Sequence, residues 1–225
     1  FSLVHFFHFI NNVPSLCHIA KSLGVPYVIS MHDFYVGCRS FNLINHNNEY
    51  CVAETDTTKC DICLAKKYET QLGSQTTRRA FYREILENSD CLIYMSPSTQ
   101  EIIEEFYPSL KFHKFSRVHG APLPTYNPEH YRRPSEISIH SNDKVKIVVP
   151  GNLALHKGGM LLVEAIKSLS NEEIEFHFWG HIDKNIEERL KKHLPKNAVF
   201  NGAYSPSELP YNQYDISLHL SVWPE

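Results

Sequence analysis

The sequence lacks long hydrophobic runs and any excess of basic charge. Its 225 residues carry 22 Lys and Arg against 25 Asp and Glu, which gives a formal net charge of -3, whereas nucleic-acid-binding domains usually carry a basic patch. No window reaches the roughly 20 apolar residues of a transmembrane helix. The longest candidate, residues 1–10, is interrupted by His5 and His8. We therefore expect no nucleic-acid partner, and no membrane contact beyond a peripheral one.

Two further patterns are missing. The chain starts at Phe1 without the basic segment, apolar stretch and small-residue cleavage site of a secretory signal. It also has no Asp-x-Asp pair of the kind that holds a divalent cation on a diphosphate. We expect a cytoplasmic protein, at the inner face of the membrane if it contacts one, with chemistry that requires no metal cofactor.

A hydrophobic content of 42% over 225 residues is enough to bury a core in one large or two small domains. Apolar strand-like runs alternate with helix-like runs, which predicts an α/β fold with parallel strands covered by helices. The expected strands are 3–9, 25–30, 91–95, 116–118, 144–149, 174–179, 198–201 and 215–220. The expected helices are 13–23, 77–88, 98–106, 159–169 and 184–193, with Ser98 and Glu101 as a capping box on the third.

The composition indicates two domains. Residues 1–120 form a doubly wound, Rossmann-like domain with a cysteine-bearing insertion at 38–63. Residues 121–143 contain four prolines among polar residues, which is typical of a linker. Residues 144–225 form a second α/β domain, in which the alternation stops early.

A glycine-rich turn at residues 150–159 (PGNLALHKGG) joins a predicted strand to a predicted helix. The first turn of a helix presents unpaired N–H groups and a partial positive charge, and glycine lets the backbone approach an anion closely. Lys157 adds a full charge. These features favour phosphate binding over an exposed, solvated lysine.

Polar side chains also follow a predicted strand of the first domain. His32 and Asp33 come after strand 25–30, and open α/β sheets bind ligands at the carboxyl ends of their strands. An imidazole there can hydrogen-bond a ligand hydroxyl or a developing charge without titrating. A histidine satisfied within its own loop is the alternative. His5 and His8, on a predicted buried strand, favour a structural role.

Together these segments resemble the family-4 glycosyltransferases of GT-B architecture over nearly the whole chain. The resemblance rests on the VHFFH segment at 4–8, the His32–Asp33 loop, the 150–159 turn and the terminal WPE at 223–225. In that family a Gly-Arg/Asn-x(4)-Lys-Gly turn binds the donor diphosphate, and a Ser-x-x-x-Glu loop brings a glutamate to the donor sugar. The matching positions are Gly151, Asn152, Lys157, Gly158, Ser221 and Glu225.

The resemblance implies an acceptor-side first domain and a second domain that binds a nucleotide sugar. A hexose-type sugar would move, with retention of configuration, from a nucleotide-diphosphate donor to a saccharide or lipid-linked acceptor in cell-surface polysaccharide or glycoconjugate synthesis. Lys157 would neutralise the departing diphosphate. Glu225 would position the sugar, and His32 would contact it from the other domain. His119 and Gly120 would lie at the interdomain edge.

The chain departs from the family pattern in two respects. Asn152 stands where many members carry arginine, so the diphosphate meets one cation fewer. A first strand with its glycine loop and a second glutamate beyond Glu225 are not in this sequence, so we expect a chain truncated at both ends, with weak donor binding and little turnover. The alternative is a non-catalytic GT-B-like scaffold for a transferase complex. A GT-B epimerase shares the fold but does not predict Lys157-Gly158 with the terminal WPE.

Four of the six cysteines lie in the insertion, and they end in a C-x(2)-C pair. This clustering fits a tetrahedral structural zinc site, while two disulfides, which a cytosolic compartment disfavours, and free thiols are the alternatives. Several polysaccharide-assembling family members carry a similar stretch, so we expect the insertion to shape the acceptor side without a catalytic role. The four are Cys38, Cys51, Cys60 and Cys63; Cys17 and Cys91 fall on apolar helix and strand positions.

Overall fold

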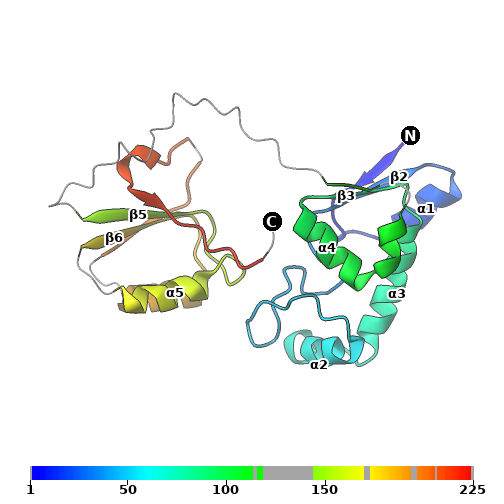
Figure 1. The fold of residues 1–225 in the computed structure, drawn as a ribbon, viewed down its shortest axis with the longest axis horizontal. Helices are drawn as coiled ribbons and strands as arrows, with labels where there is room; N and C mark the ends of the chain where they lie inside the picture. The colour runs from blue at the N-terminus through cyan, green and yellow to red at the C-terminus, as the bar shows by residue number, and fades with distance from the viewer. Residues whose placement is uncertain are drawn as a thin grey trace. The chain divides into compact units, whose positions relative to one another are not determined.

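The computed structural model describes residues 2–113, 116–118, 144–169, 173–193, 197–205 and 207–223. The chain divides into two compact units, Phe1–Pro122 with Trp223–Glu225 (unit 1) and Leu123–Val222 (unit 2). Each unit contains a four-stranded parallel sheet flanked by helices (Figure 1). The α/β class with two Rossmann-like sheets is therefore confirmed, while the predicted linker at 121–143 lies outside the described residues.

The sheet of unit 1 has the order β1-β2-β3-β4, in which every neighbouring pair is parallel. Ile29 and Leu92 are register partners on its two central strands, and neither has exposed surface. One face of the sheet is therefore fully covered at its centre. The strands are β1 (Val4–Phe6), β2 (Tyr27–Met31), β3 (Cys91–Tyr94) and β4 (Ser116–Val118).

The first strand is shorter and less buried than expected. It lies at the edge of the sheet, and both His5 and His8 are exposed, so the prediction that they lie on a buried strand is wrong. The His5 imidazole nonetheless takes part in a hydrogen bond, because its Nε2 lies 2.8 Å from Ser30 Oγ.

Three α-helices of unit 1 match the expected pattern: α1 (Leu16–Ser22), α3 (Ser74–Glu87) and α4 (Pro97–Phe106), the last followed by a short 3₁₀ helix, η1 (Pro108–Phe112). The predicted cap of α4 is wrong. Ser96, not Ser98, is the N-cap, and its Oγ accepts a hydrogen bond from the Thr99 N–H at 3.1 Å. Pro97 explains the earlier start, because proline is favoured in the first turn of a helix.

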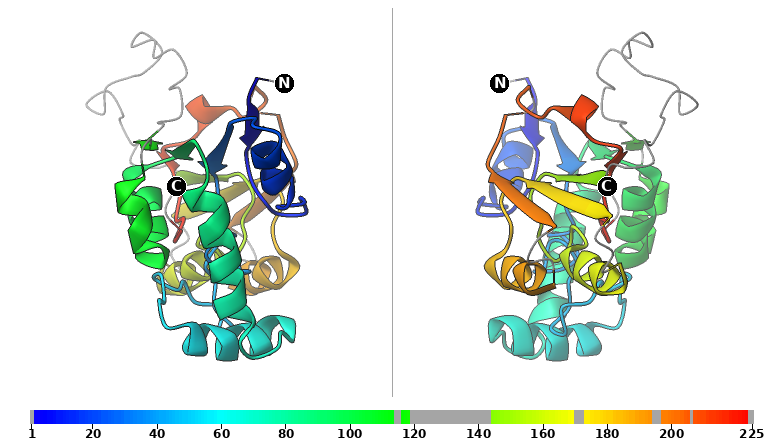
Figure 2. Two further views of the ribbon diagram at one scale, coloured as in Figure 1. Left: turned by 90° about the vertical axis from the view of Figure 1, so that its right-hand side faces the viewer. Right: turned by 90° about the vertical axis from the view of Figure 1, so that its left-hand side faces the viewer.

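A helix that was not among the expected ones, α2 (Thr57–Tyr68), begins in the insertion and ends beyond it. Asp56 caps it by accepting a hydrogen bond from the Thr58 N–H. The Asp61 carboxylate is 5% exposed and accepts the N–H groups of Gly73 and Gln75 at 2.8 and 2.9 Å. This pairing anchors α2 at the amino-terminal end of α3, away from the sheet (Figures 1 and 2).

Unit 2 has the sheet order β7-β6-β5-β8, again with parallel neighbours. Its strands are β5 (Val145–Pro150), β6 (Ile174–Trp179), β7 (Ala198–Gly202) and β8 (Ile216–Ser217). Its helices are α5 (Gly159–Ser168), α6 (Lys184–His193) and the short η4 (Tyr211–Gln213).

The strand expected at 215–220 is reduced to two residues. β8 pairs with Ile147 and Val148 of β5, and the chain then leaves the sheet. Further on, the Val222 N–H donates to the His156 carbonyl of the turn after β5 at 3.0 Å. The prediction of a strand continuing to Leu220 is therefore wrong.

A single apolar core holds unit 2 together. Phe176 and Phe178 of β6 point to the same face, as residues two apart in a strand must, and pack against α5 and α6.

In the described part of the chain, no helix is long and apolar enough to cross a membrane.

Candidate functional site

The turn after β5 is built from backbone conformations that favour glycine. Gly151 has φ +88° and Gly158 has φ +75°, the left-handed region that other residues occupy at a cost. Helix α5 begins at Gly159, immediately after this turn. The sequence-predicted order of strand, glycine turn and helix is therefore observed, and it brings the first turn of α5 to the carboxyl end of β5.

The loop after β6 supports this turn. Leu153 exchanges backbone hydrogen bonds with it, donating to the His181 carbonyl at 2.8 Å and accepting from the Asp183 N–H at 3.1 Å. Asn152 Oδ1 accepts the His181 N–H at 3.3 Å. The Asn152 oxygen thus links two loops, while its amide N–H groups are the atoms suited to an anion.

Gly180 is a site residue that sequence reasoning missed. It has φ +123°, and a Cβ atom at this position would overlap the carbonyl group of Gly151. The loops after β5 and β6 therefore touch backbone to backbone. The available signal was a glycine directly after the apolar strand Ile174–Trp179, at the end where α/β sheets bind ligands.

Lys157 and His156 are both partly buried in the turn. Burial lowers the pKa of Lys157 from its ordinary value. Burial, and then the neighbouring Lys157 charge, lower the pKa of His156, while Asp183 acts in the opposite direction. The turn therefore holds a partly desolvated cation beside a histidine that favours its neutral form.

The segment leading to the chain's last residues runs against this turn. A Cβ on Gly158 would overlap the Leu220 carbonyl, and Ser221 Oγ lies 3.5 Å from the His156 carbonyl oxygen. Ser221 thus lies beside the Lys157 turn, where the sequence placed it, although its role stays a prediction. Glu225 lies outside the described residues.

In unit 1, His32 and Asp33 follow β2 at the carboxyl edge of its sheet. His32 is exposed, with its ring centroid 6.0 Å from that of Phe7. Asp33 Oδ1 accepts the Tyr35 N–H at 2.7 Å, and burial raises the pKa of Asp33 against the opposing charges of His8, His32 and Arg78.

Arg78 is a second unpredicted member of this group. Its guanidinium lies over the rings of Tyr35 and Tyr82, 4.2 and 4.8 Å from their centroids, and Nη2 donates to the Tyr35 carbonyl. Cation–π attraction therefore holds this guanidinium near the Asp33 carboxylate. His119 and Gly120 lie outside the described residues.

The four cysteines of the insertion line one pocket in unit 1, together with His46 and Glu54. In this geometry no three Cys, His, Asp or Glu side chains of the described residues are grouped closely enough to hold a metal ion. All four are free thiols. The four predicted zinc ligands therefore line one pocket, but in the described residues they do not lie close enough together to hold one ion.

No protein-family model matches the chain, and no curated protein does. Solved structures do match. Anabaena HepE (Alr3699) in complex with UDP has a TM-score of 0.60 at 13% identity, covering 100% of this chain and 54% of that one. Its complex with UDP and glucose has a TM-score of 0.58. The OtsA apo structure has a TM-score of 0.54 at 10% identity, covering 98% of this chain and 52% of that one.

At these identities the likeness establishes the fold, which is the GT-B architecture of glycosyltransferases. The resemblance noted from the sequence is therefore confirmed at the level of the fold. The chain spans about half the length of the structures it matches.

Proposed function

We propose that this protein is a glycosyltransferase that moves a sugar from a nucleotide-diphosphate donor to a saccharide or lipid-linked acceptor. The observation that carries the proposal is the turn of unit 2, where Gly151, Gly158 and Lys157 lead into the first turn of α5. Structures of the same fold in complex with UDP and UDP-glucose support a uridine diphosphate donor. Retention of configuration, and a role in polysaccharide or glycoconjugate synthesis, rest on the sequence resemblance.

The chemistry follows from where negative charge develops. When the bond from the sugar to the diphosphate breaks, charge grows on the departing phosphate oxygens. Preorganised donors aimed at that charge lower the barrier. The partial positive charge at the start of α5 and the Lys157 ammonium would supply this stabilisation, while the Gly159 N–H itself donates to the Ala154 carbonyl at 3.0 Å. Glu225 would then position the sugar, while His32 and Asp33 are the unit 1 groups proposed to contact sugar or acceptor hydroxyls.

A non-catalytic, GT-B-like scaffold for a transferase complex is the second candidate. Asn152 favours it, because its side-chain oxygen links the loops after β5 and β6 where many related enzymes have an arginine. A neutral amide binds a diphosphate more weakly than a guanidinium does. A scaffold would have no donor hydrolysis, even with a saturating donor.

Calorimetric titration with UDP tests the donor site. We expect Lys157→Ala to weaken UDP binding by about tenfold or more, because a hydrogen bond to a charged group contributes roughly 1.5–3 kcal/mol. Lys167→Ala is the matched control, since Lys167 is exposed at the opposite end of the same helix, and it should bind UDP as the wild type does.

Hydrolysis of UDP-glucose without acceptor separates the two candidates. Turnover that disappears in Lys157→Ala supports the transferase. A transferase chain that spans about half the length of the matched structures is expected to turn over slowly, so the scaffold is favoured when UDP binds and no product forms over an extended incubation. UDP affinity that is unchanged in Lys157→Ala contradicts the diphosphate site itself.

A further inference from the structure

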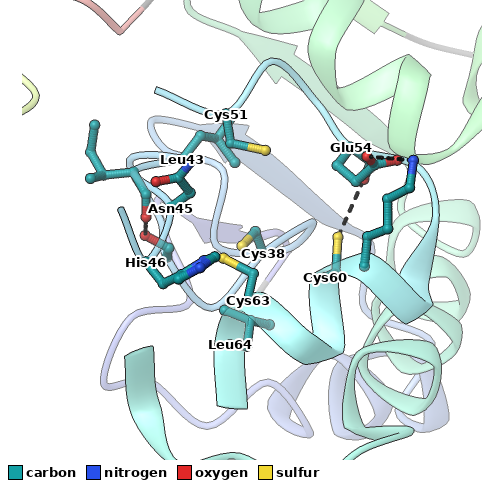
Figure 3. Close-up of a pocket in the computed structure, with 12 residues that line it drawn as sticks. Cys38, Leu43, Asn45, His46, Cys51, Glu54, Cys60, Cys63 and Leu64 are labelled. Atoms are coloured by element: carbon teal, nitrogen blue, oxygen red, sulfur yellow. Dashed lines mark hydrogen bonds and ion pairs between the residues drawn. The ribbon is translucent and has the colours of Figure 1, made fainter. Parts of the chain in front are cut away.

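The pocket of the insertion gathers thiols from three separate segments of unit 1. Cys38 belongs to the loop after β2, and Cys51 is bound to the same loop by its N–H, which donates to the Leu43 carbonyl at 2.6 Å. Cys60 and Cys63 are three residues apart on α2, and residues at this spacing share one face of a helix. All four surround a cavity of about 180 Å³ (Figure 3).

Cations and hydrogen-bond donors surround these thiols, beside one carboxylate, Glu54, which pairs with the Lys59 ammonium at 3.4 Å. Arg79 is 7% exposed, and its Nη2 lies 3.5 Å from Cys60 Sγ. Its other partners are the carbonyls of Gly37, Glu54 and Thr55 and the Phe106 ring, whose centroid lies 4.6 Å from the guanidinium carbon. Among the residues described, no carboxylate lies within ion-pair distance of Arg79. A buried cation is costly without a nearby negative charge.

His46 gives a second, independent observation, which is a missing hydrogen-bond acceptor. Its Nε2 lies 3.5 Å from the Lys66 ammonium, which can only donate, so the ring proton belongs on Nδ1. Nδ1 is buried, and in the described part of the chain it has no hydrogen-bond partner. A thiolate at this pocket would accept that proton, whereas a neutral thiol is a weak acceptor.

Four thiols that line one cavity match the ligand set of a closed tetrahedral zinc site. Zinc binds such thiols as thiolates, so their protons leave when the ion enters.

We propose that Cys38, Cys51, Cys60 and Cys63 bind one zinc ion in a closed, tetrahedral structural site. Four Zn–S bonds form as four S–H protons leave to solvent, and the product is a net dianion that offsets the Arg79 charge and accepts from His46. Zinc–sulfur bonds are about 2.3 Å long, so the loop bearing Cys38 and Cys51 closes on α2 when the ion binds. This joins the insertion to α3 through Arg79 and does not depend on the proposed transferase activity.

Metal content and Co²⁺ spectroscopy test the proposal on the wild-type protein. Protein purified under reducing conditions should release roughly one zinc per chain to a chromogenic chelator. After removal of zinc, added Co²⁺ should give thiolate-to-cobalt charge-transfer bands together with the intense visible bands of tetrahedral cobalt. Less than a tenth of an equivalent of zinc, with no such bands, overturns the proposal, as does a thiol titration that finds only two reactive thiols because the other four form disulfides.

Variants identify the ligands. Cys→Ser at any of the four pocket positions should lower zinc content several-fold, whereas Cys91→Ser, outside the pocket on β3, should retain it. His46→Ala should keep the ion and lower its affinity only modestly, because His46 acts through a thiolate. If His46→Ala abolishes zinc binding while Cys60→Ser preserves it, the four-thiolate assignment is wrong. Lys157→Ala should not change zinc content, so the two proposals fail separately.

Discussion

The two units hold their carboxyl-edge loops in place by different means. In unit 2 the contacts are between backbones, at Gly158 against Leu220 and at Gly180 against Gly151. In unit 1, buried polar side chains do this work. Asp61 of α2 accepts the Gly73 N–H at the start of α3, and Arg79 of α3 donates to the carbonyls of Gly37, Glu54 and Thr55. A backbone contact tolerates no added Cβ, and a side-chain contact tolerates no loss of its polar atoms.

This difference decides which substitutions each unit withstands, and the largest effect is expected in unit 1. Arg79→Ala should lower its free energy of unfolding by about 4 kcal/mol, because one buried carbonyl, that of Gly37, and two partly buried ones lose a charged donor. Arg83→Ala, one turn further along α3 and exposed, should stay within about 0.5 kcal/mol of the wild type. Urea denaturation followed by circular dichroism measures both. Equal losses in the two variants would contradict the anchoring role of Arg79.

Gly180→Ala tests the backbone contact of unit 2. The new Cβ would overlap the Gly151 carbonyl at a φ of +123°, so we expect a loss of about 3 kcal/mol from strain and overpacking together. Gly202→Ala is the matched control, because Gly202 has φ +78° but nothing within 4 Å of the added atom. It should cost about 1–2 kcal/mol. If both variants lose the same stability, the contact with Gly151 has no energetic role.

Two fully buried tyrosines of unit 1 differ in whether their hydroxyl group has a hydrogen-bond partner. The Tyr107 hydroxyl donates to the Val36 carbonyl at 2.8 Å, whereas the Tyr94 hydroxyl is buried and, among the described residues, has no partner. Tyr107→Phe should therefore cost about 1 kcal/mol, and Tyr94→Phe should be neutral or stabilising. Thermal unfolding of both variants measures this difference, and an equal loss in both would show that the Tyr94 hydroxyl has a partner.

The smallest expected effect is a pH dependence at Asp33. Burial raises its pKa in the folded protein, so its contribution to stability is present below the unfolded pKa and is lost as pH rises through the folded pKa. Asn keeps an oxygen for the Tyr35 N–H but does not titrate. Asp33→Asn should therefore gain stability relative to the wild type as the pH rises above about 4, the ordinary pKa of an aspartate. Glu101→Gln, at an exposed position of α4, should show no such trend.

The sequence predicted the bounds of helices and strands most accurately where the apolar residues lie on one face of the element. The bounds of β6 and α6 match the structure, because Phe176, Phe178, Ile186 and Leu190 repeat at strand and helix spacing and all enter one core. α2 was missed because two of its three buried residues are Cys60 and Asp61, so no apolar face is visible. Gly180 was missed because a glycine after a strand is common, and only the partner backbone shows why it is required.

The sequence by itself determined the α/β class, the glycine turn with Lys157 and the polar pair after β2, because periodicity and backbone preference are local properties of the chain. Only the tertiary structure decided that Ser221 lies against the Lys157 turn and that Arg78 is held between two tyrosines near Asp33. It also decided that four thiols line one pocket with hydrogen-bond donors around it. These are contacts between segments distant in sequence, and they depend on packing that no local pattern encodes.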